Sequence, residues 1–226
     1  MIRIEFIGIP GAGKSTLHAQ LVSNLKNSGA GEYLSVNDAF YLVARKEMDK
    51  IFRLFLHILP VPSAQLISDK LMNRSLFQFE AQGRFLSRHG ESFGAFVSSP
   101  SYRKLPMEDR ANLIDSYLQV GGILQCIRDG LPGRSVVLFD EGLVQKSFMF
   151  VSENSGMDEN WLSVVKYLEY IPLPEIVVCI DPPLHVCLER MYVRAKGLTN
   201  RMKRLGDQSK IDGVIRRAQE HLRGVV

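Results

Sequence analysis

The sequence predicts an α/β fold in which a parallel sheet of about four or five strands carries helices on both faces. A glycine-rich stretch, residues 8–16, lies between a β-branched run and a helical pattern, which gives the order strand, loop, helix. Val136–Phe139 and residues 176–180 are apolar at every position, as expected for strands buried on both faces. Helical patterns separate these runs, so we expect parallel strands joined by helices.

The first half of the chain begins with a predicted strand at Ile2–Ile7, a helix at about residues 14–26 and a short strand at residues 33–36. Residues 39–130 show no convincing strand pattern. We therefore expect a large helical insert between the second and third strands, with its longest helix at residues 107–127.

The second half of the chain returns to alternating strands and helices. Residues 190–206 are rich in arginine and lysine, and we expect them to form a basic lid. We interpret residues 1–226 as one domain. The remaining expected elements are a strand at Val136–Phe139, a helix at about 160–170, a strand at 176–180, a helix to about 194 and a helix at about 207–223.

Residues 8–16 read Gly-Ile-Pro-Gly-Ala-Gly-Lys-Ser-Thr and match the phosphate-loop pattern G-x-x-x-x-G-K-[ST]. Glycines let the backbone turn tightly, so that its N–H groups point at phosphate oxygens. Lys14 would reach the β- and γ-phosphates of a nucleotide, and the Ser15 hydroxyl would bind Mg²⁺. The alternative is a glycine turn that happens to contain a lysine. The predicted nucleotide-binding residues of the loop are Gly8, Gly11, Ala12, Gly13, Lys14, Ser15 and Thr16.

Carboxylates follow each of the later predicted strands. Asp140 ends an apolar run, and we expect it to hold Mg²⁺ together with Ser15, the alternative being that it caps the next element. Glu141 would orient the acceptor or activate water, or it is simply solvated. Asp38 would accept the proton of an acceptor hydroxyl, or it caps the next helix. We expect Asp181 to cap the helix that follows it.

Two arginines near the C-terminal end of the chain are candidates for phosphate binding. Arg190 and Arg194 are four residues apart on a predicted helix, and therefore share one face. A guanidinium group offers paired donors that suit the oxygens of a transferring phosphoryl group. The alternative is a solvated basic helix. Arg201 and Arg204 follow in the predicted lid.

The charge of the chain is placed unevenly. The formal net charge is +4, but the segment from Glu189 to the end carries ten basic and four acidic residues, a net charge of +6. Residues 1–188 therefore carry a net charge of −2. A local basic segment suits phosphate binding better than a nucleic-acid surface, so we do not expect a nucleic-acid partner.

Segment patterns and cysteine spacing bear on compartment and assembly. We expect a cytoplasmic protein, because no secretory signal and no apolar run of membrane-spanning length is apparent, and we expect no membrane association. Cys126, Cys179 and Cys187 lack metal-ligand spacing and are interpreted as reduced structural residues, with Cys179 in a buried strand. A homodimer is compatible with the sequence.

These motifs, in this order, resemble those of P-loop small-molecule kinases of the nucleoside and nucleotide kinase group. The resemblance rests on residues 8–16, Asp38, Phe139-Asp140 and the stretch from Ile180 to Arg194. It implies a three-layer P-loop NTPase fold that uses ATP and Mg²⁺. The segment after Phe139 is similar to the Asp-Arg-Tyr segment of thymidylate kinases, but Glu141 stands where those families have arginine, which leaves the acceptor open.

The main functional hypothesis is therefore an ATP- and Mg²⁺-dependent kinase. It would transfer the γ-phosphate to a hydroxyl or phosphate of a small molecule held between the sheet edge and the helical insert. A nucleoside or nucleotide is the first expectation, and a sugar or antibiotic-like alcohol the next. The alternative is a P-loop ATPase or nucleotide-dependent switch that acts on a macromolecular partner, as the adjacent acids Asp140 and Glu141 suggest. The predicted catalytic residues are Lys14, Asp38, Glu141, Arg190 and Arg194.

Overall fold

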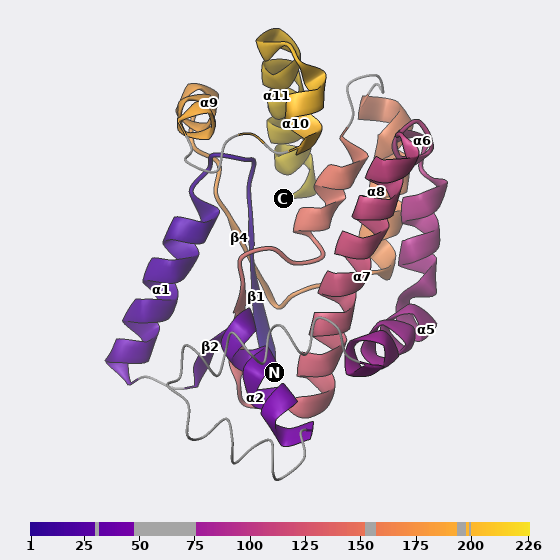
Figure 1. Cartoon of the computed structure of the whole chain (residues 1–226). Helices are drawn as coiled ribbons and strands as arrows, with labels where there is room; N and C mark the ends of the chain where they lie inside the picture. The colour runs from indigo at the N-terminus through magenta and orange to yellow at the C-terminus, as the bar shows by residue number, and fades with distance from the viewer. Residues whose placement is uncertain (30–31, 48–75, 152–156, 194–197, 199) are drawn as a thin grey trace.

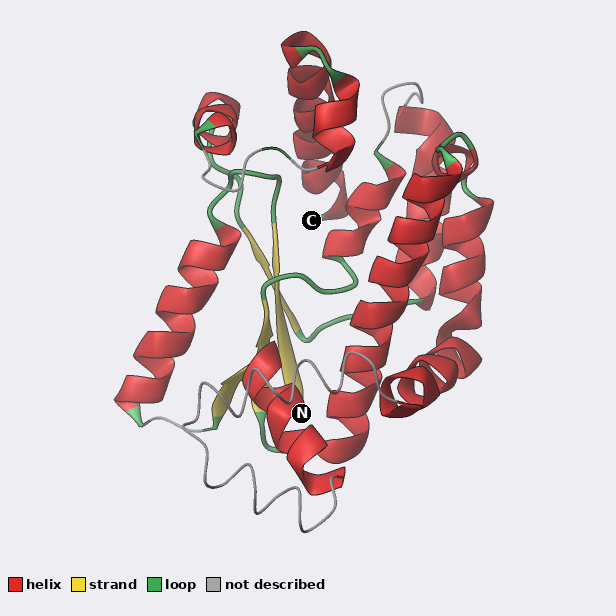
Figure 2. Cartoon of the chain, in the orientation of Figure 1, coloured by secondary structure: helices red, strands yellow, loops and turns green. Residues whose placement is uncertain are grey.

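The computed structural model of the chain describes residues 1–29, 32–47, 76–151, 157–193, 198 and 200–226 (Figure 1). Its centre is a four-stranded, all-parallel sheet in the order β2-β3-β1-β4. The strands are β1 (Ile2–Ile7), β2 (Tyr33–Ser35), β3 (Val136–Phe139) and β4 (Ile176–Cys179). The predicted α/β class and parallel sheet are thus confirmed, and Figure 2 shows how the helices surround the strands.

Alternate residues of β1 face two helical layers. Ile4 and Phe6 pack with Val22 of α1 (Lys14–Ser28) on one face of the sheet. Ile7 belongs to a larger core on the other face. Figure 1 shows α1 on one side of the sheet and α7 and α8 on the other. The larger core is built by helices α2 (Val36–Glu47), α5 (Leu76–Ser98), α7 (Met107–Gly130) and α8 (Met157–Tyr170).

The described part of the insert between β2 and β3 is helical, as predicted. It contains α2, α5, α7 and the short α6 (Pro100–Arg103), while residues 48–75 lie outside the description. Its centre is the buried ring of Tyr117, which lies 5.7 Å from the ring centroids of both Phe85 and Phe96. Aromatic rings in such offset contacts bury large apolar areas, and these contacts stabilise the packing of α5 against α7.

Strand β4 differs from the prediction. We expected it to be buried on both faces, but Ile176 is 48% and Val177 40% exposed, and Cys179 is exposed too. The physical reason is its position: β4 pairs with β1 and, among the described residues, no strand lies on its other side. An all-apolar run is therefore not sufficient evidence for a central strand.

The C-terminal segment packs over the carboxyl end of the sheet. A second core joins Ile9 and Ala12 to α9 (Leu184–Tyr192), α10 (Asn200–Leu205) and α11 (Gln208–Val225). The predicted lid, residues 190–206, falls on the end of α9 and on α10, with residues 194–197 and 199 outside the description. Among the described helices, none is both long and apolar enough to cross a membrane.

The contact between α5 and α7 gives a test of the core. A Cβ on Gly121 of α7 would lie 2.3 Å from the ring of Phe85, which is fully buried and has no space to move. We predict that Gly121→Ala lowers the free energy of unfolding by about 1–3 kcal/mol through overpacking. Gly94→Ala is the matched control, because Gly94 is exposed on α5 with open space around it.

Urea denaturation measures both variants. Alanine should raise the stability at Gly94 by about 0.5–1 kcal/mol, because glycine is the poorer helix former. Equal effects of the two substitutions would contradict the packing in this core.

Candidate functional site

The glycine-rich loop, residues 8–16, joins β1 to α1 at the carboxyl end of the sheet. Gly11 and Gly13 have φ of +83° and +94°, in the left-handed region that side chains avoid. A Cβ on Gly11 would also lie 2.1 Å from the carbonyl oxygen of Cys187 in α9. A Cβ on Gly8 would lie 2.6 Å from the oxygen of Ile180. The loop therefore packs directly on the backbone that follows β4.

The loop ends at the N-terminus of α1. Helix α1 begins at Lys14, directly after Gly13. Among the described residues, no side chain caps its first turn. Ser15 and Thr16 are exposed in that turn, and Ala12 is buried behind it. The first N–H groups of a helix have no acceptor within the helix, and the helix dipole adds partial positive charge there. This is a backbone arrangement that suits an anion.

Two cationic side chains lie beside this helix terminus. The Lys14 Nζ donates hydrogen bonds to the carbonyl oxygens of Gly8 (2.7 Å) and Ile9 (3.4 Å), which holds the ammonium group against the loop. The Arg190 Nη1 lies 3.5 Å from the position that a Cβ on Gly13 would take. The structure thus brings the predicted residues Lys14 and Arg190 together, from opposite ends of the sequence.

Gln145 is part of the site although sequence reasoning missed it. It opens the 3-10 helix η1 (Gln145–Phe150), and its side chain clasps Gly8 at both backbone groups. Its Oε1 accepts from the Gly8 N–H (2.9 Å), and its Nε2 donates to the Gly8 oxygen (3.1 Å). No spacing rule predicts a glutamine here, so only the fold shows this contact.

A buried carboxylate lies beneath that clasp. Glu5 on β1 is fully buried, and its Oε1 accepts from the backbone N–H of Gln145 (2.8 Å). Burial raises the pKa of Glu5 to about 7, against the opposing effect of the Gln145 hydrogen bond. Gly142 leaves the space for it, since a Cβ there would lie 2.3 Å from the Glu5 carboxyl carbon. A charged residue within an apolar strand was the available sequence signal.

The predicted strand-end acids of β3 lie at the same sheet edge. Glu5 of β1 pairs in register with Phe139, so Asp140 follows β3 close to the start of the loop, and it is half-buried. Glu141 is exposed, with its Oε2 3.9 Å from the Lys146 Nζ. Among the described residues, no three His, Cys, Asp or Glu side chains group as a metal cage.

Asp38 is not brought to this site. Its carboxylate accepts from Lys26 Nζ (2.7 Å) and from the backbone and hydroxyl of Ser35, which is a capping box at the start of α2. Partial burial acts to raise the pKa of Asp38, but these hydrogen bonds outweigh it and lower the pKa. Lys26 is about 18 Å along α1 from Lys14, at 1.5 Å per residue. Figure 1 shows α2 far from α9.

The remaining predicted residues have other places. Arg194 lies outside the described residues, as do the side chains of Arg201 and Arg204. Asp181 does not cap α9, contrary to the prediction. Its two carboxylate oxygens instead accept from Gln219 Nε2 (2.5 Å) and Arg223 Nε (2.9 Å) of α11.

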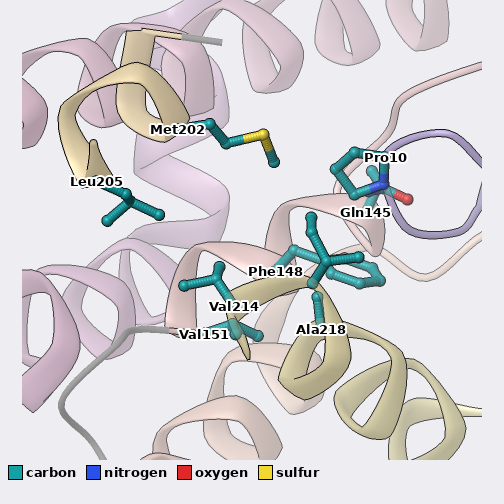
Figure 3. A pocket seen from close by; sticks show the side chains of 9 residues that line it. Pro10, Gln145, Phe148, Val151, Met202, Leu205, Val214 and Ala218 are labelled. Atoms are coloured by element: carbon teal, nitrogen blue, oxygen red, sulfur yellow. The ribbon is translucent and has the colours of Figure 1, made fainter. Parts of the chain in front are cut away.

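An apolar cavity of about 130 Å³ adjoins the loop at Pro10 (Figure 3). Helices α10 and α11 and the segment of η1 form its other walls. Two comparisons with known proteins give no match: no protein-family model matches the chain, and no curated protein matches it in sequence.

The Gln145 clasp predicts a local effect. Gln145→Ala removes both hydrogen bonds to Gly8, so the Gly8 amide should exchange its hydrogen about fivefold faster, as expected for about 1 kcal/mol of lost protection. Gln119→Ala is the control, since Gln119 is bonded to Asp115 on the exposed side of α7. Hydrogen exchange followed by NMR measures both. Unchanged Gly8 protection in the first variant would contradict the clasp.

Glu5 predicts a pH dependence of stability. Its pKa is about 7 in the folded protein and 4.5 for an ordinary glutamate, so folding is favoured most below about pH 4.5. The contribution is lost as the pH rises through about 7, by about 3 kcal/mol at ~1.4 kcal/mol per unit. Glu5→Gln removes this titration. Between about pH 4.5 and 7, the difference in unfolding free energy between wild type and Glu5→Gln should therefore change by about 3 kcal/mol. A difference that stays constant over this pH range would contradict the raised pKa of Glu5.

Proposed function

We propose that the chain is an ATP- and Mg²⁺-dependent phosphotransferase with a three-layer P-loop fold, acting on a small molecule. The observation that carries the proposal is the convergence of Lys14 and Arg190 on the uncapped N-terminus of α1. Backbone N–H groups, a lysine and an arginine around one helix terminus suit a triphosphate better than any neutral ligand.

The loop and Lys14 have distinct roles in this proposal. The loop backbone cradles the β- and γ-phosphates. The Lys14 ammonium leaves its carbonyl acceptors for the phosphates, and the Gly8 oxygen keeps the hydrogen bond from Gln145 when this happens. Arg190 neutralises the charge that spreads over the transferring group. The Gln145 clasp therefore lets Lys14 exchange partners without leaving a buried carbonyl unsatisfied.

The residues at the sheet edge fit a nucleotide-bound magnesium ion. Mg²⁺ keeps several waters and takes most of its remaining ligands from the phosphates, so one or two protein oxygens are enough. Ser15 is exposed in the first turn of α1, and Asp140 lies at the end of β3 next to β1. These two residues would hold the ion, which neutralises phosphate charge when bound. The proposal does not use Asp38.

A second candidate function is an ATPase or switch that acts on a macromolecular partner. The observation in its favour is that Glu141 is exposed directly after Asp140, where a carboxylate can activate water. The two functions differ in one measurable property. A kinase releases ADP in response to a small acceptor, whereas the ATPase ignores such acceptors and responds to its partner.

The test is ADP release from Mg-ATP with and without pooled small acceptors. Lys14→Ala should reduce acceptor-dependent release about 100-fold or more, because a charge facing the transition state is lost. Lys26→Ala is the matched control on the same helix, since its exposed ion pair with Asp38 is worth about 1 kcal/mol or less. Full activity of the Lys14→Ala variant would contradict the proposed function. ADP release that no acceptor changes would favour the ATPase.

A further inference from the structure

The cavity beside the glycine-rich loop has walls from three parts of the chain (Figure 3). Pro10 contributes the loop wall, and Figure 3 shows Met202 of α10 extending toward it across the cavity. The cavity lies at the carboxyl end of the sheet, next to the phosphate-binding backbone. Its other lining residues are Gln145, Phe148, Val151, Leu205, Val214, Ile215 and Ala218.

The lining is almost entirely apolar. Gln145 is the one polar side chain among the described lining residues, and its amide is already bonded to Gly8 at both ends. Among the described residues that line the cavity, none has a charged side chain. A sugar or a second phosphate group placed there would exchange part of its hydrogen bonds to water for contacts with apolar side chains, which is unfavourable. The cavity therefore selects an apolar, uncharged group.

The size of the cavity narrows the class further. An apolar cavity of roughly 150 Å³ is known to take a benzene-sized ligand, and this one measures about 130 Å³. Met202 in its roof is an unbranched, adaptable side chain that adjusts to ligand shape. A single ring or a short branched chain fits these dimensions, whereas a disaccharide would extend out of the cavity.

The position of the cavity connects it to the chemistry of the loop. Pro10 and Gln145 both line the cavity, and both adjoin residues whose carbonyl oxygens hold Lys14, namely Gly8 and Ile9. A group seated in the cavity therefore lies beside the backbone that holds Lys14. The walls that hold it come from α10, which lies within the basic segment, and from α11, so both helices also shape the acceptor site.

We propose that this cavity binds the apolar body of the phosphoryl acceptor, and that the acceptor is an uncharged apolar alcohol. This inference rests on the proposed kinase function. In the reaction the acceptor hydroxyl oxygen forms a bond to the γ-phosphorus, and the bond from that phosphorus to the β,γ-bridging oxygen breaks. ADP leaves with the bridging oxygen, and the hydroxyl proton passes to water.

The first test measures binding separately from turnover. Benzyl alcohol is the apolar probe and glycerol the polar one, and ligand-observed NMR measures their affinity for the wild-type protein in the absence of ATP. We expect benzyl alcohol to bind and glycerol not to bind. ATP binding is measured in parallel, so that a failure of the proposed kinase function is distinguished from a failure of the proposed acceptor cavity. Absence of benzyl alcohol binding overturns the cavity proposal, whatever ATP does.

Two substitutions at one position locate the ligand. Val214 is half-buried in the cavity wall, so Val214→Phe should fill the space and raise the KM or Kd for benzyl alcohol about tenfold or more. Val165→Phe on the exposed side of α8 is the matched control and should change neither value. Val214→Ala enlarges the cavity and should shift the preference toward naphthylmethanol. This variant tests the cavity even if Val214→Phe does not fold.

The outcomes separate the possible occupants. A benzyl alcohol preference that responds to Val214 but leaves the Kd for ATP unchanged supports the proposal. Weaker ATP binding in Val214→Phe, with unchanged alcohol binding, places the nucleotide base in the cavity and overturns it. Phosphorylation of thymidine or glucose in preference to benzyl alcohol also overturns it, while leaving the kinase function intact.

Discussion

The close packing of the glycine-rich loop on the backbone after β4 is the constraint on which the site depends. At Gly11 there is no room for a Cβ against Cys187, and at Gly8 none against Ile180. Because the loop touches bare backbone, α9 approaches closely enough for Arg190 to reach the N-terminus of α1. Any side chain at these glycines would push α9 away from the loop and move Arg190 away from the N-terminus of α1.

The segment η1, which bonds to Gly8 of the loop, is itself bonded to a buried carboxyl group, and the burial of this group lowers the stability of the fold. Glu5 keeps a carboxyl group in the core, where burial raises its pKa to about 7 and makes folding less favourable at higher pH. His221, buried near Ser147, works in the other direction, because burial lowers its pKa to about 4 and its penalty grows as the pH falls. Both residues bond to η1, Glu5 at Gln145 and His221 at Ser147, so the segment that carries Gln145 is least penalised near the middle of this pH range.

Much of the architecture could be predicted from sequence because local patterns determine it. The strand, loop and helix around Lys14 follow from glycine spacing and β-branched residues, and the helical insert follows from its apolar periodicity. Asp38 and Asp181 were harder, since a carboxylate after a strand serves equally well as a cap, an ion-pair partner or a catalytic group. Which of these it becomes depends on α1 and α11, whose positions are set by tertiary packing. Gln145 had no sequence signal for the same reason.

The basic C-terminal segment is best understood through the two faces of its helices. In α11, Ile215 and Ala218 line the cavity and Ile211 packs in one core with Ile9 of the loop, while Arg216 is exposed and Arg223 pairs with Asp181. Its positive charge is therefore directed to solvent and to the β4–α9 connection, and apolar groups face the site. In the proposed reaction, Lys14, Arg190 and the N-terminus of α1 would bind the charged phosphates, and the cavity would select the acceptor by its shape. An acceptor that carried its own phosphate would need cations on the apolar side, and the described wall of the cavity offers none.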